Sequence, residues 1–177
     1  MLSLESKRWT ELKASPGGDG NLALRLLKQA RGGDAAAFDE LLHQVCHQMT
    51  VGEVAYAIVP HLVELARHSV LSDRVHALTI VGWVVAAAQL NMAPAVPADL
   101  DSDYRESQQP ALILTLRALE DSSHDRNVVL DLLGVAAALK GNPHLAIHLL
   151  LHDGNGDLSC PECGEYIRFA EVRDEGG

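Results

Sequence analysis

An internal repeat constrains the fold of this chain more than any other feature of its sequence. Residues 73–87 align with residues 125–139, and the two segments share Asp, Arg, Leu, Gly and Ala at equivalent positions. A third copy begins at Asp34 and shares the Asp and the apolar stripe, but not the Arg or the Gly. A Pro-x-Leu step follows each copy, at Pro60, Pro110 and Pro143. The unit is therefore a pair of antiparallel helices. Because one pair cannot bury its apolar face alone, we expect the pairs to stack into a short α-solenoid.

The composition supports an all-α fold. Of the 177 residues, 28 are Leu and 23 are Ala, whereas only seven are aromatic. Leu and Ala favour helices, while strands favour aromatic and β-branched residues. The 47% of hydrophobic residues is enough for one well-buried core, which argues against a disordered chain. Trp83 and Tyr56 are expected in the core or in a groove rather than at a cofactor.

Capping residues, glycines and prolines divide the chain into expected helices. The helices are expected at residues 2–14, 21–30, 34–47, 50–68, 72–91, 104 or 108 to 119, 123–141 and 143–152. Their expected N-caps are Asn21, Asp34, Thr50, Ser72 or Asp73, and Ser123. The resulting division is a helical repeat domain over 1–152, whose first 20 residues form a helix and a Gly-rich linker, followed by a knuckle hairpin and tail over 153–177.

The cysteines and the apolar segments indicate a cytoplasmic protein. The three cysteines include one close pair, which is not typical of a disulfide framework. The N-terminus carries charges and has no apolar core of a signal peptide. The most apolar stretch, residues 77–90, is shorter than the roughly 20 residues needed to span a bilayer. No membrane association is expected.

The charge is unevenly distributed. Residues 1–31 have a net charge of +3, whereas residues 32–177 have a net charge of −13. This acidity disfavours nucleic-acid binding, which needs Lys and Arg against phosphates, and favours a basic protein partner. We expect the partner-binding residues to cluster at one set of helix connections; they are Asp99, Asp101, Asp103, Glu106, Glu120 and Asp121, with Asp125 beside them. The alternative is a solvated acidic surface that maintains solubility.

Cys160-Pro161-Glu162-Cys163-Gly164 is the most distinctive motif. Two thiolates on such a turn can share one Zn²⁺, but a structural zinc needs four ligands. The nearest donors are histidines spaced four apart on the preceding helix, which share one face. A Cys₂His₂ zinc site would comprise Cys160, Cys163, His148 and His152. The alternative is a knuckle that has lost its metal. A redox role is disfavoured because no βαβ pattern surrounds the motif.

Two weaker patterns have ordinary explanations. His43, Cys46 and His47 share a helical face that could bind a metal or a substrate, but a packed Cys and hydrogen-bonded histidines explain them as well. Residues 153–157 imitate the start of a calcium loop. The sixth and twelfth loop positions lack the Gly and Glu that calcium binding requires, so we interpret the segment as a turn.

The chain resembles HEAT-like repeat proteins. The resemblance rests on Asp-capped helices, an internal Pro in each second helix and the repeat length. Residues 33–67, with Cys46-His47-Gln48 and Tyr56 before Pro60, are similar to the first repeat of small bacterial HEAT-like proteins. Some of these also begin with a Trp-containing helix and end in a Cys-Pro-x-Cys-Gly segment. Many are encoded near polymorphic toxin systems, so the resemblance implies an immunity or partner-binding role.

We therefore expect a non-enzymatic scaffold that neutralises a bacterial toxin by covering its active surface. The chain has no nucleophile elbow, P-loop, Rossmann glycine pattern or His-Glu-x-x-His. Two alternatives remain open. One is a zinc-binding regulatory or nucleic-acid-associated module built on the knuckle, and the other is a hydrolase that uses the face of His43 and His47.

Overall fold

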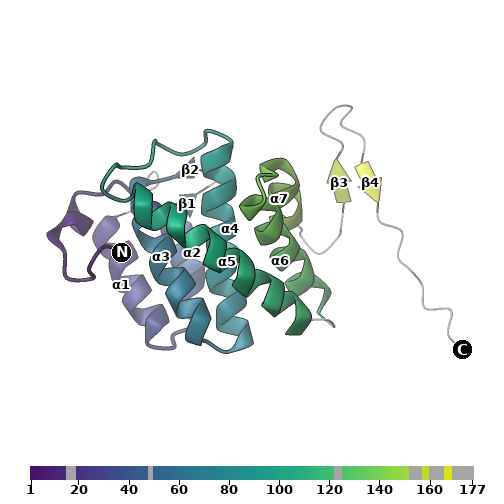
Figure 1. Cartoon of the computed structure of the whole chain (residues 1–177), viewed down its shortest axis with the longest axis horizontal. Coiled ribbons are helices and arrows are strands. Elements are labelled where there is room, and N and C mark those ends of the chain that lie inside the picture. The colour runs from purple at the N-terminus through teal and green to yellow at the C-terminus, as the bar shows by residue number, and fades with distance from the viewer. Residues whose placement is uncertain (15–18, 48–49, 122–124, 152–156, 160–165, 169–177) are drawn as a thin grey trace, which may run out of the picture.

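The computed structural model describes residues 1–14, 19–47, 50–121, 125–151, 157–159 and 166–168. Within them the fold is mostly helical, which confirms the all-α prediction (Figure 1). The helices are η1 (Lys7–Thr10, a 3₁₀ helix), α1 (Gly20–Arg31), α2 (Ala36–Val45), α3 (Glu53–His68), α4 (Leu71–Gln89), α5 (Asp101–Asp121), α6 (Arg126–Leu139) and α7 (Pro143–Leu150). The strands β1 (Cys46–His47) and β2 (Thr50–Val51) pair antiparallel, as do β3 (Asp157–Ser159) and β4 (Tyr166–Arg168).

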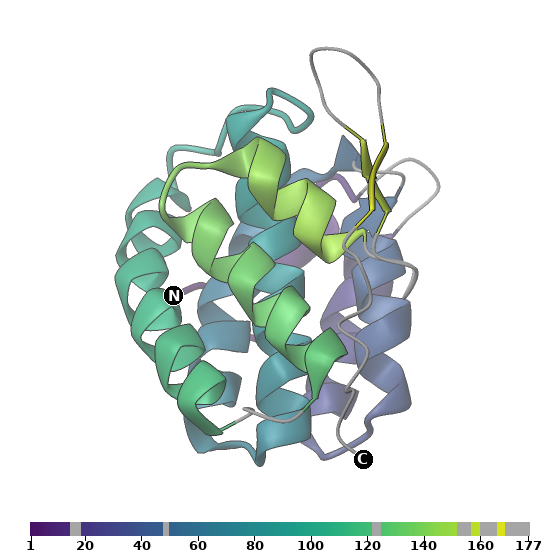
Figure 2. The same ribbon diagram turned by 90° about the vertical axis from the view of Figure 1, so that its right-hand side faces the viewer.

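The helices contact one another in two series. Helix α3 packs between α1 and α5, and α4 packs between α2 and α6. Cross-contacts join α1 with α2, α3 with α4, and α5 with α6, while α7 packs on α6 and α4 (Figure 2). The sequence pairs the helix at 34–47 with the one at 50–68, but the main helical partners of α2 are α1 and α4. The β1–β2 pair lies between α2 and α3 in the chain and redirects it.

Helix α4 is the centre of the core. Its buried residues lie on every side of the helix, because α2, α3, α5, α6 and α7 all contact it. Such an all-round apolar helix is expected in the interior of a protein. Within the described residues, α4 is the one helix whose length and composition would allow it to cross a bilayer, and most of that segment is buried in the fold.

The glycines of the repeat allow two close helix contacts. A methyl group at Gly82 in α4 would lie 2.9 Å from Cγ2 and 3.0 Å from Cα of Val135 in α6. A methyl group at Gly134 in α6 would lie 2.8 Å from Cγ of Leu150 and 3.2 Å from the carbonyl oxygen of Ala146, both in α7. Each of the two equivalent glycines therefore lets its helix approach the next helix of the stack closely.

Two helices begin with a different capping residue from the one predicted. Asp19, rather than Asn21, caps α1, and its carboxylate accepts a 2.9 Å hydrogen bond from the Asn21 N–H. Asp125, rather than Ser123, caps α6 and accepts from two N–H groups of the first turn. Ser123 lies outside the described residues. In both helices an Asp satisfies N–H groups that the helix itself leaves unpaired.

Three other helices begin without a side-chain hydrogen bond from their N-cap residue. The N-cap of α2 is Ala35 rather than the predicted Asp34, although the Asp34 carboxylate accepts a 3.1 Å bond from the Ala36 N–H. The N-cap residues of α3 and α4 are Gly52 and Val70, so the predicted caps Thr50 and Ser72 or Asp73 are wrong. Thr50 belongs to β2, and its backbone pairs with β1. Helix α3 therefore starts at Glu53, three residues later than predicted, after β2 ends.

The lengths of three further elements differ from prediction. The expected helix at 2–14 is only the short η1, and the remainder of that segment is not helical. Helix α5 begins at Asp101, before both predicted starts, and continues through Pro110 to Asp121. Helix α7 ends at Leu150. Antiparallel pairing of β3 with β4 agrees with the predicted C-terminal hairpin, although the residues joining them lie outside the described segments of the chain.

Candidate functional site

The six predicted partner-binding acids do not form one surface. Helix α5 is continuous over its 21 residues, so its two ends are about 30 Å apart at 1.5 Å per residue. Asp99, Asp101, Asp103 and Glu106 lie at its N-terminal end, and the other two lie in its last turn. The predicted single cluster is therefore wrong, because the length of α5 separates its two groups of acids.

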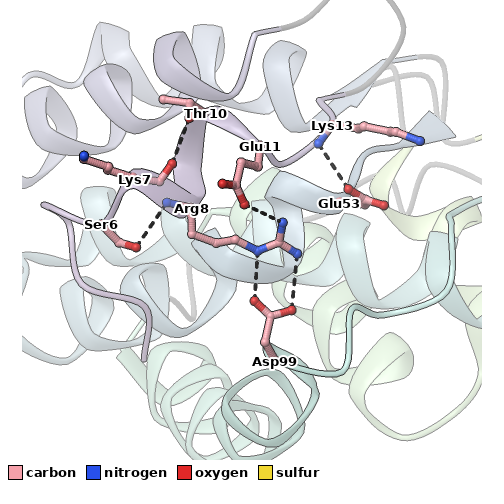
Figure 3. Close-up of polar contacts among 8 residues, drawn as sticks. All are labelled: Ser6, Lys7, Arg8, Thr10, Glu11, Lys13, Glu53 and Asp99. Atoms are coloured by element: carbon pink, nitrogen blue, oxygen red, sulfur yellow. Dashed lines mark hydrogen bonds and ion pairs between the residues drawn. The ribbon is translucent and has the colours of Figure 1, made fainter.

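Cations of the N-terminal segment neutralise some of the first group. Arg8 donates to Asp99 from Nε at 2.9 Å and from a second nitrogen at 3.3 Å, and it also contacts Glu11 at 3.2 Å (Figure 3). The Arg8 hydrogen bonds lower the pKa of Asp99. The Met1 ammonium forms an ion pair with Asp103. A basic segment of the chain thus occupies some of the surface assigned to a basic partner.

The remaining acids have local contacts or are exposed. Asp101 accepts a 2.7 Å bond from Arg105 one turn along α5, and the Glu106 carboxylate accepts a 2.6 Å bond from the Ser102 hydroxyl. At the other end, Asp121 lies 3.6 Å from Arg74, and Glu120 is exposed. Asp101, Glu106 and Asp121 thus already have partners within the protein.

A buried histidine fastens the N-terminal segment. His61 in α3 is only 2% exposed, and its Nε2 lies 2.8 Å from the Leu2 carbonyl oxygen. A carbonyl only accepts, so Nε2 carries the proton; Nδ1 then accepts from Arg31 at 3.4 Å. Trp9 packs on the ring with centroids 5.9 Å apart. Burial lowers the pKa of His61, with the Arg31 charge acting in the same direction.

Backbone contacts complete the attachment. The Lys13 N–H donates to the Glu53 carboxylate at 3.2 Å (Figure 3). The Val54 N–H donates to the Lys13 carbonyl at 3.0 Å. The first turn of α3 is thereby joined to a residue about 40 positions earlier in the chain. The N-terminal segment is therefore part of the folded domain, and Arg8 and the Met1 ammonium are engaged in ion pairs within it.

A groove lies between α2, α4 and α7, and Asp131 of α6 lines one end of it. It consists of two adjoining hollows of about 380 Å³ and 190 Å³, which share Leu42 and Thr79. The larger hollow is lined by Leu42, His43, Cys46, Thr79, Trp83, Leu150 and Leu151. The smaller is lined by Phe38, Asp39, Leu42, His76, Thr79, Ile80 and Asp131. A hollow of several hundred Å³ with mainly apolar walls is the usual form of a binding site.

Two members of the predicted His/Cys face line this groove. His43 is exposed and Cys46, although buried, reaches the wall of the larger hollow. The third member, His47, begins no further helical turn, because α2 ends at Val45 and the chain enters β1. The prediction that the three residues share one helical face is therefore wrong for His47, which lies in β1.

The two ends of the groove differ in polarity. At the larger hollow, Trp83 is 9% exposed and Leu151 is 57% exposed, so apolar surface is accessible there. At the smaller hollow, the carboxylates of Asp39 and Asp131 lie beside His76, whose ring packs on Phe38 at 5.7 Å. The formally charged lining residues are thus both acidic.

Thr79 lies where the two hollows meet. Its Oγ1 is buried and has no hydrogen-bond partner among the described residues. By contrast, Thr115 in α5 donates to the carbonyl oxygen one turn earlier at 2.8 Å. Buried hydroxyl groups are normally paired, so the unpaired Thr79 hydroxyl, which lies beneath the surface of the groove, is unusual.

The predicted zinc ligands are not brought together by the described segments of the structure. His148 is half-buried in α7, whereas Cys160, Cys163 and His152 lie outside the described residues. No group of three or more possible metal ligands occurs among the residues that are described. The zinc site remains a prediction from the motif.

Comparison of the chain with protein-family models, with curated proteins and with solved structures finds no match. The groove is therefore interpreted from its own geometry. The sequence placed Trp83 in the core or in a groove, which its position confirms. It gave no indication of Thr79, Asp39 or Asp131, whose shared location depends on how α2, α4 and α6 pack.

Proposed function

We propose that this protein is a non-enzymatic scaffold that binds another protein, built as a short HEAT-like α-solenoid. The two series of helix contacts support the solenoid, because each of the helices α1 to α4 packs on the next but one in the chain. Stacked helix pairs present long surfaces and commonly serve in recognition. The equivalent close contacts at Gly82 and Gly134 support a repeated structural unit.

The groove between α2, α4 and α7 supports the binding role more than any other feature. It combines a Trp at its wall with Leu side chains, and interface hot spots are rich in Trp that is packed in such hollows. The acids at the N-terminal end of α5 serve as a rim that accelerates association, reduced in strength by Arg8 and the Met1 ammonium.

The particular role that we propose is cytoplasmic immunity to a bacterial toxin. It follows from the resemblance to small bacterial HEAT-like proteins and from the net charge of −10, which suits a basic toxin domain. Binding covers the active surface of the toxin and needs no catalytic group on this chain.

A co-expression assay tests the proposal. The protein is expressed with the toxin encoded beside its gene, and both cell survival and co-purification are measured. We expect protection by the natural chain and its loss in Leu151→Asp, which places a charge in the groove. Val70→Asp is the matched control, because Val70 is 68% exposed and lies outside the groove. Absence of both protection and a complex contradicts the proposal, and equal protection by Leu151→Asp removes the groove from it.

A zinc-binding regulatory module is the second candidate, supported by the Cys160–Cys163 motif that follows α7. His148 has exposed surface in the last turn of that helix, as a ligand from the helix requires. Metal analysis of the purified chain tests it: one zinc per chain, lost in Cys163→Ser and reduced in His148→Ala, is the expected result. His144→Ala is the control, because His144 is exposed one turn earlier. A metal-free natural chain contradicts this candidate.

A further inference from the structure

We propose that the N-terminal segment, residues 1–14, is released from α3 when His61 takes up a proton. The segment then acts as a pH-sensitive cover of the N-terminal end of α5. This conformational change belongs to the chain itself and goes beyond the proposed binding function, because it needs no partner.

The hydrogen bonds of His61 require a neutral ring. Its Nε2 donates to the Leu2 carbonyl oxygen at 2.8 Å, and its Nδ1 accepts from Arg31 at 3.4 Å. A guanidinium has no acceptor, so a proton on Nδ1 places an N–H group against the N–H groups of Arg31. His61 is 2% exposed, so water cannot replace the missing acceptor. The closed structure therefore excludes the protonated ring.

The charged groups that act on the ring come from three other elements. Arg31 of α1 and the Met1 ammonium of the N-terminal segment oppose a positive charge on His61, whereas Asp103 of α5 favours it. Asp103 already forms an ion pair with the Met1 ammonium. On α3 itself, Glu64 is engaged in ion pairs at the surface. Burial, assisted by the two cations, lowers the pKa of His61, so proton uptake requires a change of structure around the ring.

Detachment of the N-terminal segment is the change that exposes the ring. The Leu2 carbonyl oxygen and the Trp9 ring, which contact His61, both belong to this segment. Residues 1–14, all of them described, contain a 3₁₀ helix of four residues as their one helix or strand. The segment can therefore open while the α-helices persist. Burial of Trp9 and Leu12 keeps it closed while His61 is neutral.

Release changes the acidic surface at the start of α5. Arg8 leaves Asp99, and the Met1 ammonium leaves Asp103, because both cations belong to the released segment (Figure 3). The two carboxylates are then available to other cations. Proton uptake by His61 thus increases the attraction of a basic partner to this rim, a consequence that alone rests on the proposed function.

Hydrogen exchange of two N–H groups reports the release. The Val54 N–H donates to the Lys13 carbonyl at 3.0 Å, and the Trp9 indole N–H donates to the Ser3 carbonyl at 2.9 Å. Both groups meet water when the segment detaches. The Val81 N–H in the middle of α4 is the reference for wider unfolding. Protection factors, corrected for the intrinsic pH dependence of exchange, are measured by NMR on the full chain at pH 7.0 and pH 5.5.

The protection factors of the Val54 and Trp9 groups should fall about eightfold between the two pH values. This ratio is expected for a histidine that titrates near about pH 6.5 in the open form and stays neutral in the closed form. The direction follows because the open form binds the proton, and the fall levels off below the lowered pKa of His61 in the closed form. The free energy of opening should be smaller at Val54 than at Val81 at both pH values.

Two variants test the assignment to His61. His61→Gln keeps a donor and an acceptor but does not titrate, so the protection of Val54 should no longer depend on its charge, and the eightfold fall should disappear. Arg31→Gln supplies an acceptor for a protonated Nδ1 in the closed form, so the fall should be reduced to about twofold. Arg25→Gln is the matched control, because Arg25 is an exposed cation of the same helix. It should retain the full effect, as should His68→Gln on the surface of α3.

Three results would overturn the inference. Equal free energies of opening at Val54 and Val81 show that the segment does not open separately. Protonation of His61, seen in its ring NMR signals, with constant protection at Val54 and Trp9 shows that Arg31 alone moves. An unchanged fall in His61→Gln assigns the pH dependence to another group. If His61→Gln does not fold, the comparison of Arg31→Gln with its control and the ring titration of the natural chain still decide.

The outcomes also separate this inference from the proposed function. The exchange experiment contains no toxin, so a failure of the co-expression assay leaves the release of the segment standing. Conversely, protection that does not change with pH removes the release but leaves the binding scaffold in place.

Discussion

Gly82 is the residue at which a small change in volume has the largest expected effect. In Gly82→Ala the new methyl group meets both Cγ2 and Cα of Val135, and a backbone atom cannot turn aside. Overpacking costs about 1–3 kcal/mol, of which the better helix propensity of Ala recovers about 1 kcal/mol. Chemical denaturation should show a lower free energy of unfolding. In the double variant with Val135→Ala, the combined loss should be smaller than the sum of the two single losses; additive losses would contradict the contact.

His61 makes the stability depend on pH. Its pKa is lowered in the folded protein, so below about pH 6.5 the unfolded chain binds a proton that the folded chain resists. The free energy of unfolding should therefore decrease as pH falls from 6.5 through the lower folded pKa, measured by urea denaturation. His61→Gln, which can donate and accept but does not titrate, should reduce this decrease. His68→Gln is the control, since His68 is exposed; an equal reduction in both variants would contradict the assignment.

The two threonines give opposite predictions for the same substitution. Thr79→Val removes a hydroxyl without a hydrogen-bond partner among the described residues, so the free energy of unfolding should stay within about 0.5 kcal/mol or rise. Thr115→Val removes a hydroxyl that donates to Ala111 at 2.8 Å in a fully buried position, and about 1 kcal/mol should be lost. Thermal or urea denaturation of the two variants tests the contrast, and equal losses would contradict the unpaired state of Thr79.

At the scale of the elements, the start of α6 depends on one carboxylate. Asp125→Ala removes the acceptor for two N–H groups of the first turn and should cost about 1 kcal/mol of unfolding free energy. Asp125→Ser should recover most of that loss, because Ser also caps. Asp73→Ala is the matched control: Asp73 aligns with Asp125 in the repeat but is not the N-cap of α4. An equal loss at the two positions would contradict the difference.

The elements also show how far the sequence could be interpreted. Helical content, the C-terminal hairpin and most helix locations were predictable, because they follow from periodicity, Leu and Ala content and turn residues. The N-cap residues were harder to predict. The repeat aligns Asp73 with Asp125, yet α4 begins two residues before Asp73 and α6 begins just after Asp125. The start of α5 was predicted at 104 or 108, whereas the helix begins at Asp101.

The site could be predicted only to a limited extent, for a reason of packing. His43 and Cys46 were recognised from their spacing on one helix, which is local information. Asp39 and Asp131 come from α2 and α6, 92 residues apart, and meet only because α4 lies between these helices. The predicted acidic cluster failed for the converse reason: residues close in the sequence were separated by the full length of α5.

At the scale of the whole molecule, the two ends of the stack differ in how they are held. The N-terminal end is fastened by contacts of Leu2, Trp9 and Lys13 with α3. At the other end, α7 has eight residues, of which only Ala146 and Leu150 are buried. Hydrogen exchange should therefore be fast in α7 and slow in α3 and α4, because local opening follows the density of buried contacts. Faster exchange in α3 than in α7 would contradict this.

The contact of Arg8 with Asp99 has a consequence for the order of disassembly. Asp99 lies in the connection between α4 and α5, so this ion pair ties the start of the chain to its middle, and the bond from Tyr56 to the Pro94 carbonyl ties α3 to the same connection. Helices α1 to α4 are thereby enclosed between two fastened points, while α6 and α7 follow outside them. Under a pulling force or in the presence of a protease, the molecule should therefore lose its helices from the C-terminal end, with α7 and α6 unfolding before α1 to α4.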